Sequence, residues 1–324
     1  MDYQALGRTA LRISRLGFGC GNIGGLMVRG TAADQERAVA RAVELGITYF
    51  DTAPMYGDGE SETNLGRVLA VLRPQIVLAT KSPAPPEARG RLGAAIAQSA
   101  EASLRRLRRD RVDVFQLHTA VTLAGGNGTL DVRTVIEEVI PAFEALRQAG
   151  KIGFYGFSGT GEAAALPQLV ATGAFDVFQV IYNILNPSAG EPAFARVGPD
   201  YANVLAQAAD QRMGAAAIRV LAGGALSGID ARHPISSQRV VPMGTSADYR
   251  ADLERAQRLL PLVSEGHVAS LTEAALRFAI THPAISTALV GFSDLAQIEA
   301  AVDAVNKGPL PLATLNRVAE LLSA

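Results

Sequence analysis

Short apolar segments alternate with longer segments of helical periodicity, and this unit repeats eight times along the 324-residue chain. The apolar segments lie at 12–21, 47–54, 76–81, 112–118, 152–159, 176–183, 215–224 and 284–292. The helical segments lie at 31–46, 61–73, 91–110, 134–150, 162–173, 202–214, 271–283 and 295–308. Strands that are apolar at nearly every position are typical of a parallel sheet covered by helices. Eight such units predict an α/β fold, a closed (β/α)8 TIM barrel that occupies residues 1–324 as a single domain.

An open, doubly wound sheet is the alternative architecture for the same alternation. The glycine spacing in Gly19–Gly24 matches the G-x-G-x-x-G pattern of dinucleotide-binding folds. That pattern requires an acidic residue about 20 residues further on, and Asp51 follows only after about 30. The spacing on its own is weak evidence, so we favour the barrel.

Three further segments complete the expected architecture. Residues 3–14 predict a hairpin around Gly7 that plugs one end of the barrel. Pro141 should kink its helix or mark where the helix begins. The segment 228–264 is rich in Pro, Gly, Ser and His and interrupts the alternation, so we expect long functional loops there, on the side of the barrel formed by the carboxyl ends of the strands.

Charge and cysteine content exclude several classes of partner and site. The net charge is −1, which gives no electrostatic case for binding nucleic acid or an anionic membrane. The basic run at residues 105–109 lies at the end of a helical pattern, where it predicts a solvated helix terminus. Cys20 is the only cysteine, so disulfides and cysteine-based metal sites within the chain are excluded. The chain has neither a signal-peptide pattern nor an apolar run of about 20 residues, so we expect a cytoplasmic protein. We also expect it to be a monomer or weak homo-oligomer.

Polar side chains close several of the predicted strands. Asp51, Lys81 and His118 end three consecutive apolar segments, and Tyr56 follows the first of them by five residues. Taken singly, each residue has an ordinary structural explanation, such as a turn cap or a buried histidine with a partner. Together they are hard to explain by packing, because the carboxyl ends of barrel strands form one rim, where active sites lie.

These four residue types suit proton transfer to a carbonyl oxygen. A tyrosine has a pKa of about 10, and a lysine ammonium beside it should lower that value. Asp51 would keep Lys81 charged and in place, and a neutral His118 would orient a substrate oxygen. Because no side chain carries a hydride, the hydride would come from a cofactor.

The chain resembles the aldo-keto reductase superfamily over essentially its whole length. The motifs that carry the resemblance are LGRTALRISRLGFGCGNIGG, AVELGITYFDTAPMYGDGESETNLG, IVLATK, VDVFQLH, GKIGFYGFSG, FQVIYNILN, IRVLAGGALSG and LVGFSDLAQIEAAV. The resemblance implies a barrel that binds an extended nicotinamide nucleotide. It also implies that Tyr56 is the general acid/base and that Lys81 tunes its pKa. Asp51 would then support Lys81, and His118 would position the carbonyl.

The same resemblance implies the cofactor contacts. They are Gly19, Asp51, Ser158, Gln179, Arg219, Leu221, Gly223, Gly291, Phe292, Ser293 and Gln297. Ser158 and Gln179 match positions that hold the carboxamide of the nicotinamide, and Arg219 is placed to meet the pyrophosphate. The family usually has an asparagine directly after this serine, whereas this chain has Gly159. The family also has an aromatic residue that stacks on the nicotinamide, and its position falls near Ile218 or Arg219 in this chain.

The last strand–helix turn departs furthest from the family pattern. Relatives specific for NADP place a Lys or Arg here, whereas this chain reads Gly291-Phe292-Ser293-Asp294. Asp294 would repel a 2′-phosphate if it pointed inward, or it would only cap the following helix. We therefore expect NAD or NADP as cofactor, with a lean to NAD or dual use, and no metal.

The expected reaction is hydride transfer between the nicotinamide and an aldehyde, ketone or sugar lactol, or the corresponding alcohol. The variants GFSDLAQ and IRVLAGGALSG resemble sugar- and pyridoxal-type dehydrogenases. One alternative is a non-catalytic nicotinamide-binding regulatory subunit of the same fold. A metal-dependent barrel hydrolase is the other, but the rim offers one histidine beside a lysine rather than a ligand cluster. His233, His267 and His282 read as surface residues, with His233 a possible pocket residue.

Overall fold

The computed structural model describes residues 1–190 and 197–323 and is built around a closed barrel of parallel strands. The barrel strands are β3 (Leu16–Gly19), β4 (Tyr49–Asp51), β5 (Val77–Ser82), β6 (Val112–Leu117), β9 (Ile152–Ser158), β10 (Val177–Ile181), β11 (Gly214–Ile218) and β12 (Ile285–Gly291). They follow one another around the ring in chain order, and β12 pairs with β3 to close it. The closed barrel is therefore confirmed and the open sheet is wrong.

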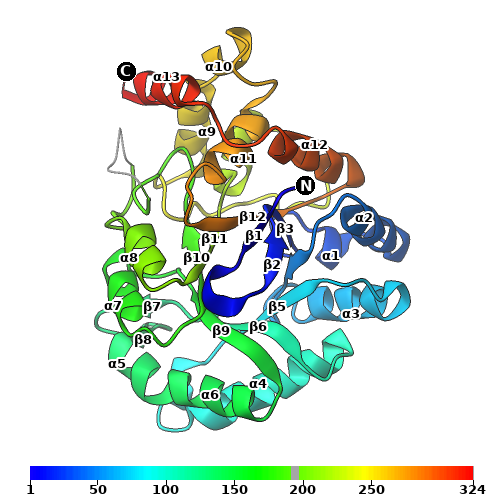
Figure 1. Ribbon diagram of the computed structural model, residues 1–324, viewed down its shortest axis with the longest axis vertical. Helices are drawn as coiled ribbons and strands as arrows, with labels where there is room; N and C mark the ends of the chain where they lie inside the picture. Colours follow the sequence, from blue (N-terminus) through cyan, green and yellow to red (C-terminus); the bar gives the residue numbers. More distant parts are fainter. Residues whose placement is uncertain (191–196, 324) are drawn as a thin grey trace.

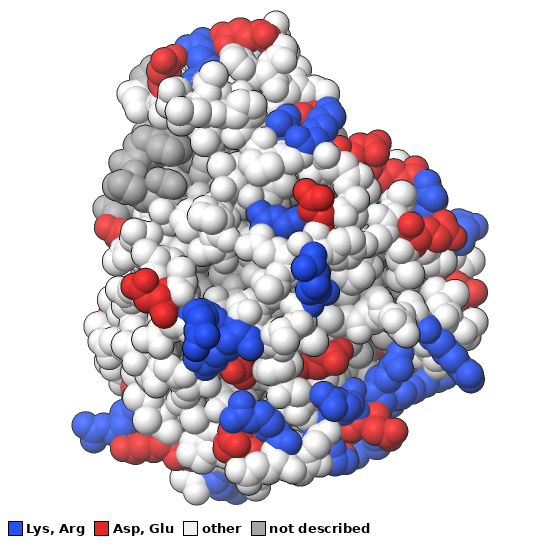
Figure 2. Space-filling model, in the orientation of Figure 1, with Lys and Arg blue, Asp and Glu red and all other residues white. Residues whose placement is uncertain are grey.

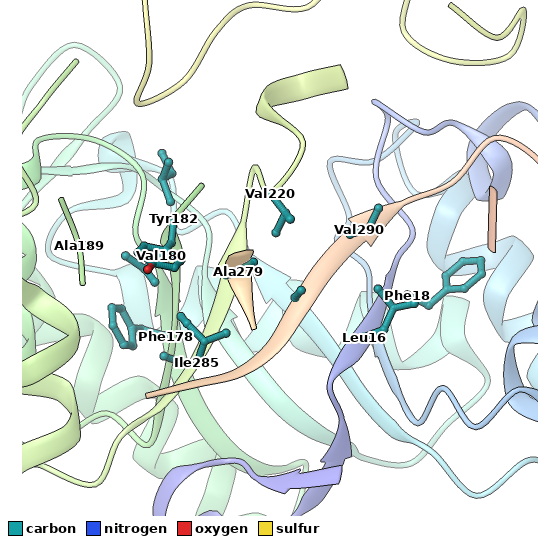
Figure 3. Packing of buried hydrophobic residues seen from close by; sticks show 14 of the residues in the cluster. Leu16, Phe18, Phe178, Val180, Tyr182, Ala189, Val220, Ala279, Ile285 and Val290 are labelled. Carbon is teal, nitrogen blue, oxygen red and sulfur yellow. The ribbon is translucent and has the colours of Figure 1, made fainter. Parts of the chain in front are cut away.

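Helices follow the strands and form the outer layer of the molecule (Figure 1). The main ones are α2 (Ala32–Glu44), α3 (Glu60–Leu72), α4 (Leu92–Leu107), α6 (Ile140–Gln148), α7 (Leu166–Ala171), α8 (Val204–Asp210), α11 (Leu271–Ala279) and α12 (Leu295–Asn306). Thr31 begins α2 as a cap that accepts a hydrogen bond from the Asp34 backbone N–H at 3.2 Å. The outer faces of the strands pack beneath these helices, as shown for Phe18 on β3 and Phe178 on β10 in Figure 3.

An N-terminal hairpin closes the end of the barrel where the strands begin, as predicted. β1 (Tyr3–Ala5) pairs antiparallel with β2 (Arg12–Ser14), and the pair lies across the ring of strands in Figure 1. The turn at Gly7 lies so close to β11 that a Cβ there would be 2.1 Å from the Gly214 nitrogen. Leu6 and Ile13 are fully buried at this end of the barrel.

The inside of the barrel is layered. The layer above the hairpin is apolar and consists of Tyr49, Ala79, Val114 and Val177. The residues two positions further along the same strands share its inward face and form a polar layer of Asp51, Lys81, Gln116 and Gln179. The charged groups therefore lie toward the carboxyl end of the barrel, one side chain above an apolar floor.

Three segments differ from the expectations. The segment 228–264 is not irregular throughout, because its second half forms α9 (Tyr249–Gln257) and α10 (Pro261–Ser264). Pro141 lies in the first turn of α6, in agreement with the expectation that it marks a helix start, but the π-helical segment (Val135–Val139) that leads directly into α6 was not expected. An unpredicted helix, α13 (Leu312–Ser323), follows α12.

Charges of both signs are interspersed with broad neutral areas on the face shown in Figure 2. The basic run at the end of α4 is only partly solvated. Arg105 and Arg108 are exposed, whereas Arg106 pairs at 2.6 Å with the fully buried carboxylate of Glu62. Among the described residues, the structure has no helix whose length and apolar character would let it cross a membrane.

Candidate active site

The turn after β4 carries Tyr56 back over the barrel rim. The Tyr56 backbone N–H donates to the Ala53 carbonyl at 3.1 Å, and the Tyr56 carbonyl accepts from the Ser61 N–H at 3.1 Å. The buried Ser61 hydroxyl donates to the Cys20 carbonyl at 2.9 Å, which ties this turn to the loop after β3. These bonds fix the position of the phenol relative to the strand that carries Asp51.

Lys81 connects the two ends of this turn. Its ammonium donates to the Asp51 carboxylate, to the Thr52 carbonyl at 2.9 Å and to the Tyr56 hydroxyl at 3.1 Å. The lysine is fully buried, so these three acceptors replace its hydration shell. The Asp51 carboxylate also accepts from the Gln116 amide at 3.3 Å and the Gln179 amide at 2.7 Å.

The electrostatics of Tyr56 differ from the expectation. Burial raises the pKa of the Tyr56 phenol, and Asp51 adds to this, while Lys81 acts in the opposite direction without outweighing burial. Lys81 lowers the pKa of the phenol as predicted, but burial outweighs this effect, so the net pKa is raised and the phenol is held protonated. Burial by itself would lower the pKa of Lys81, but Asp51 and Tyr56 outweigh it, so the pKa of Lys81 is raised and the ammonium persists.

His118 faces the phenol edge-on, with 5.6 Å between the ring centres. Burial, helped by the charge of Lys81, lowers the pKa of His118 to about 3, so the imidazole is neutral as expected. Its Nδ1 is buried and has no hydrogen-bond partner among the described residues. The ring lines the cavity, which leaves Nε2 as the nitrogen that can reach a ligand.

A cavity of about 650 Å³ extends from this cluster across the carboxyl end of the barrel. Asp51, Tyr56 and His118 lie in its wall, and the α12 residues Gln297, Ala300 and Ala301 also line it. The predicted cofactor contacts all line the same cavity: Gly19, Asp51, Ser158, Gln179, Arg219, Leu221, Gly223, Gly291, Phe292, Ser293 and Gln297. The cavity thus joins residues from widely separated parts of the sequence.

The end of β9 explains why the asparagine common in relatives is absent. A Cβ on Gly159 would lie 2.4 Å from the Gln179 carbonyl oxygen and 2.9 Å from a Leu166 methyl, so no side chain fits. Ser158 donates to the Gln179 amide oxygen at 3.4 Å. That oxygen keeps a second lone pair, so the two residues can still bind an amide group.

The loop after β11 has an unusual backbone. Arg219, Ala222, Gly223 and Gly224 all have positive φ angles, and the two glycines let the chain pass without side chains along the cavity. Arg232 lies beside this loop and donates to the Gly223 carbonyl at 3.0 Å. Sequence reasoning missed Arg232, because it lies in a segment without periodicity or a motif that would set it apart.

The turn after β12 is occupied by internal hydrogen bonds. Asp294 caps α12 by accepting from the Gln297 N–H at 2.8 Å, which agrees with its reading as a helix cap. The Ser293 hydroxyl donates to the Gly24 carbonyl at 2.7 Å. His233 reaches the cavity from the loop 228–248, and its Nε2 lies 3.6 Å from the Asp294 carboxylate.

The part of that loop around Ser237 is bonded to the loop after β3. The Ser237 N–H donates to the Ile23 carbonyl at 3.0 Å, and its hydroxyl donates to the Asn22 carbonyl at 2.8 Å. Arg29 adds a bond to the Ile235 carbonyl at 2.6 Å. The described residues contain no group of three or more His, Cys, Asp or Glu side chains that could hold a metal ion.

Comparison with protein-family models identifies the family of this chain. The model of the aldo/keto reductase family matches residues 15–323. The aldo-keto reductase AKR11C1 from Bacillus halodurans, in its holo form, superposes with a TM-score of 0.74 at 26% sequence identity. It covers 100% of this chain and 97% of its own.

Two curated relatives are similar over nearly the whole chain. The L-galactose dehydrogenase of Arabidopsis thaliana is 28% identical over 317 residues, which is 95% of this chain and 89% of the relative. A probable voltage-gated potassium channel subunit beta from the same plant is 26% identical over 333 residues, 96% of this chain and 93% of the relative.

Proposed function

Because the chain belongs to the aldo/keto reductase family, an oxidoreductase family that uses nicotinamide nucleotides, we propose that Tyr56 is its general acid/base. The observation that carries this proposal is the Lys81 ammonium, which contacts both the Tyr56 hydroxyl and the Asp51 carboxylate. A proton donor, a fixed cation and a neutral imidazole then surround one point of the cavity. That arrangement suits the reduction of a carbonyl group and the reverse oxidation of an alcohol.

In the reductive direction, the substrate carbonyl oxygen accepts hydrogen bonds from the Tyr56 hydroxyl and from His118 Nε2–H. Tyr56 gives its proton to that oxygen as negative charge develops on it. Lys81 stabilises the phenolate that is left, and Asp51 keeps the lysine charged and in place. When bound, the nicotinamide supplies the hydride. In the oxidative direction, the phenolate takes the proton back from the alcohol.

The cavity wall fits a nicotinamide dinucleotide. Ser158 and Gln179 would hold the carboxamide, since they are bonded to each other and line the same cavity as Tyr56. The side-chain-free loop at Gly223, with Arg232 beside it, would hold the diphosphate. The remaining proposed contacts are Gly19, Leu221, Gly291, Phe292, Ser293 and Gln297.

We propose NAD, or use of both nucleotides, over strict NADP. The turn after β12 presents the carboxylate of Asp294 and the backbone-bonded Ser293 where NADP-specific relatives place a cation. His233, from the loop 228–248, approaches the Asp294 carboxylate at 3.6 Å.

The substrate belongs to the aldehydes, ketones and sugar lactols. Similarity to a protein named L-galactose dehydrogenase supports including sugars. The non-catalytic nicotinamide-binding subunit is the competing function, supported by the similarity to the channel subunit beta. The complete set of Asp51, Tyr56, Lys81 and His118 argues against it.

The Tyr56→Phe variant tests the proposal. It removes only the phenolic hydroxyl, so turnover of a carbonyl panel with NADH and NADPH should fall by about 10²-fold or more. Cofactor binding, followed by fluorescence titration, should be largely retained. Turnover near that of the wild type in this variant would contradict the mechanism, and a wild type that binds cofactor without turnover would favour the subunit.

A further inference from the structure

Arg219 is a cation in the cavity that the proposed reaction does not use. Its side chain is half-buried and lines the cavity together with Tyr56 and His118. Its backbone has a φ of +55°, a conformation that non-glycine residues adopt only when their surroundings hold them there. Among the residues that the structure describes, the guanidinium makes one long hydrogen bond, from Nη1 to the Val241 carbonyl at 3.4 Å. Most of its five N–H donors are therefore free to bind a ligand.

Among residues 1–190 and 197–323, the guanidinium of Arg219 forms no ion pair with a carboxylate. Two of the described acidic residues line the cavity, and both are already paired. Asp51 holds Lys81, and Glu273 is bound by Arg277 at 2.8 Å and by Lys307 at 2.7 Å. Burial lowers the pKa of Arg219, and the group that opposes this is the Tyr56 phenol. A half-buried guanidinium without a counter-charge is costly, and an anionic ligand would remove that cost.

Two anions could reach this guanidinium. One is the diphosphate of the cofactor, since Nη1 lies 3.5 Å from where a Cβ on Gly223 would be. The other is an acidic group on the substrate. Arg232 already bonds to the Gly223 carbonyl and covers the glycine loop. Arg219 passes close to the same loop, but its Nη1 bonds to the carbonyl of Val241, a residue that is 80% exposed, and the Tyr56 phenol is the group that acts on its pKa.

We propose that Arg219 binds an anionic group of the substrate, a carboxylate or a phosphate ester, while the carbonyl of the same molecule lies at Tyr56. Met243 lines the cavity near Val241 and gives the rest of such a substrate an apolar contact. This inference rests on the proposed function, because it places the reacting carbonyl at Tyr56. It makes acidic aldehydes and ketones, including sugar acids or phosphates, the preferred class.

The test compares two aldehydes that differ in charge. 4-Formylbenzoate carries a carboxylate, and its methyl ester has nearly the same shape without the charge. Binding of each to the complex of the enzyme with oxidised nucleotide is measured by calorimetry, which needs no turnover. We expect the acid to bind about ten-fold more tightly than the ester, the effect of one charge-assisted contact.

Three arginine variants identify the anion. Arg219→Gln should remove the preference for the acid, and Arg219→Lys should keep part of it. Arg232→Gln should weaken nucleotide binding instead and leave the acid-to-ester ratio unchanged. Arg250→Gln changes an exposed arginine that does not line the cavity, and this variant should bind all ligands as the wild type does.

The proposal is overturned if the wild type binds the acid and the ester equally. It is also overturned if Arg219→Gln weakens binding of the nucleotide and of both aldehydes by the same factor, because that result would assign Arg219 to the diphosphate. Failure of the proposed reaction would be seen elsewhere, as turnover that survives in Tyr56→Phe.

Discussion

Lys81 Nζ lies 3.1 Å from the Tyr56 hydroxyl and 4.8 Å from the centre of its ring, yet the pKa of the phenol is raised. The lysine comes from β5 and the tyrosine from the turn after β4, so the contact is made by the register of the barrel. Burial dominates the phenol, and the lysine limits the rise. A protonated phenol beside a fixed cation is suited to giving a proton and to tolerating the charge that remains.

The buried pair of Asp51 and Lys81 should couple stability to activity. Lys81→Met leaves a buried carboxylate without its cation and should lower the free energy of unfolding by about 3–5 kcal/mol. Adding Asp51→Asn should restore most of this stability, while turnover stays low because the cation beside Tyr56 is missing. Urea unfolding and turnover of the two variants check both parts. A double variant as unstable as the single one would contradict the pairing.

The pH dependence should come from Tyr56 and not from His118. The pKa of His118 is about 3, so the imidazole stays neutral above about pH 5. Reduction needs the protonated phenol, whose pKa is raised, so kcat/KM for reduction should be level from about pH 5 to 8 and fall only in the alkaline range. Oxidation needs the phenolate and should rise there. An inflection near neutral pH that is absent in His118→Gln would show that the histidine titrates.

Asp294 should weaken NADP binding through its charge. Asp294→Ser keeps a good helix cap and removes the carboxylate, so affinity for NADPH relative to NADH should rise about two- to five-fold. Fluorescence titration with both nucleotides measures the ratio. Asp294→Ala is the control for the cap and should cost about 1 kcal/mol of stability. A strong NADPH preference in the wild type would refute this reading of the turn.

Gly159 should not accept the asparagine of related proteins. Gly159→Asn forces a Cβ to within 2.4 Å of the Gln179 carbonyl oxygen, so stability should fall by about 1–3 kcal/mol without a gain in nucleotide affinity. Thermal unfolding and nucleotide titration test this. Gly93→Ala is the control, because Gly93 lies in α4 with open space around its Cβ position. This variant should be more stable than the wild type. Equal effects at both positions would contradict the steric argument.

The sequence predicts much of this architecture because the barrel repeats one simple pattern. The eight apolar segments mark the strands, and polar residues at their ends mark the rim. Asp51, Lys81 and His118 could be found because a buried strand rarely ends in a charge. Even α13 had a signal, since Thr314, Val318 and Leu322 are buried at helical spacing.

Other features depend on groups that are distant in sequence. The raised pKa of Tyr56 follows from the depth of burial, which no local pattern encodes. Arg232 reaches the cavity through an irregular loop, and the absent side chain at Gly159 is explained by Gln179 on the next strand and by Leu166. Such properties arise when the barrel closes.

The apolar floor of the barrel also has an electrical consequence. Tyr49, Ala79, Val114 and Val177, sealed from below by the hairpin, form a low-dielectric wall one side chain thick beneath Asp51 and Lys81. Water can screen these charges from the open side alone, so their field is directed toward the phenol and the cavity. The hairpin therefore keeps water away from the lower side of the charged pair. A polar residue placed in the hairpin would alter proton transfer at the opposite end of the barrel without contacting a substrate.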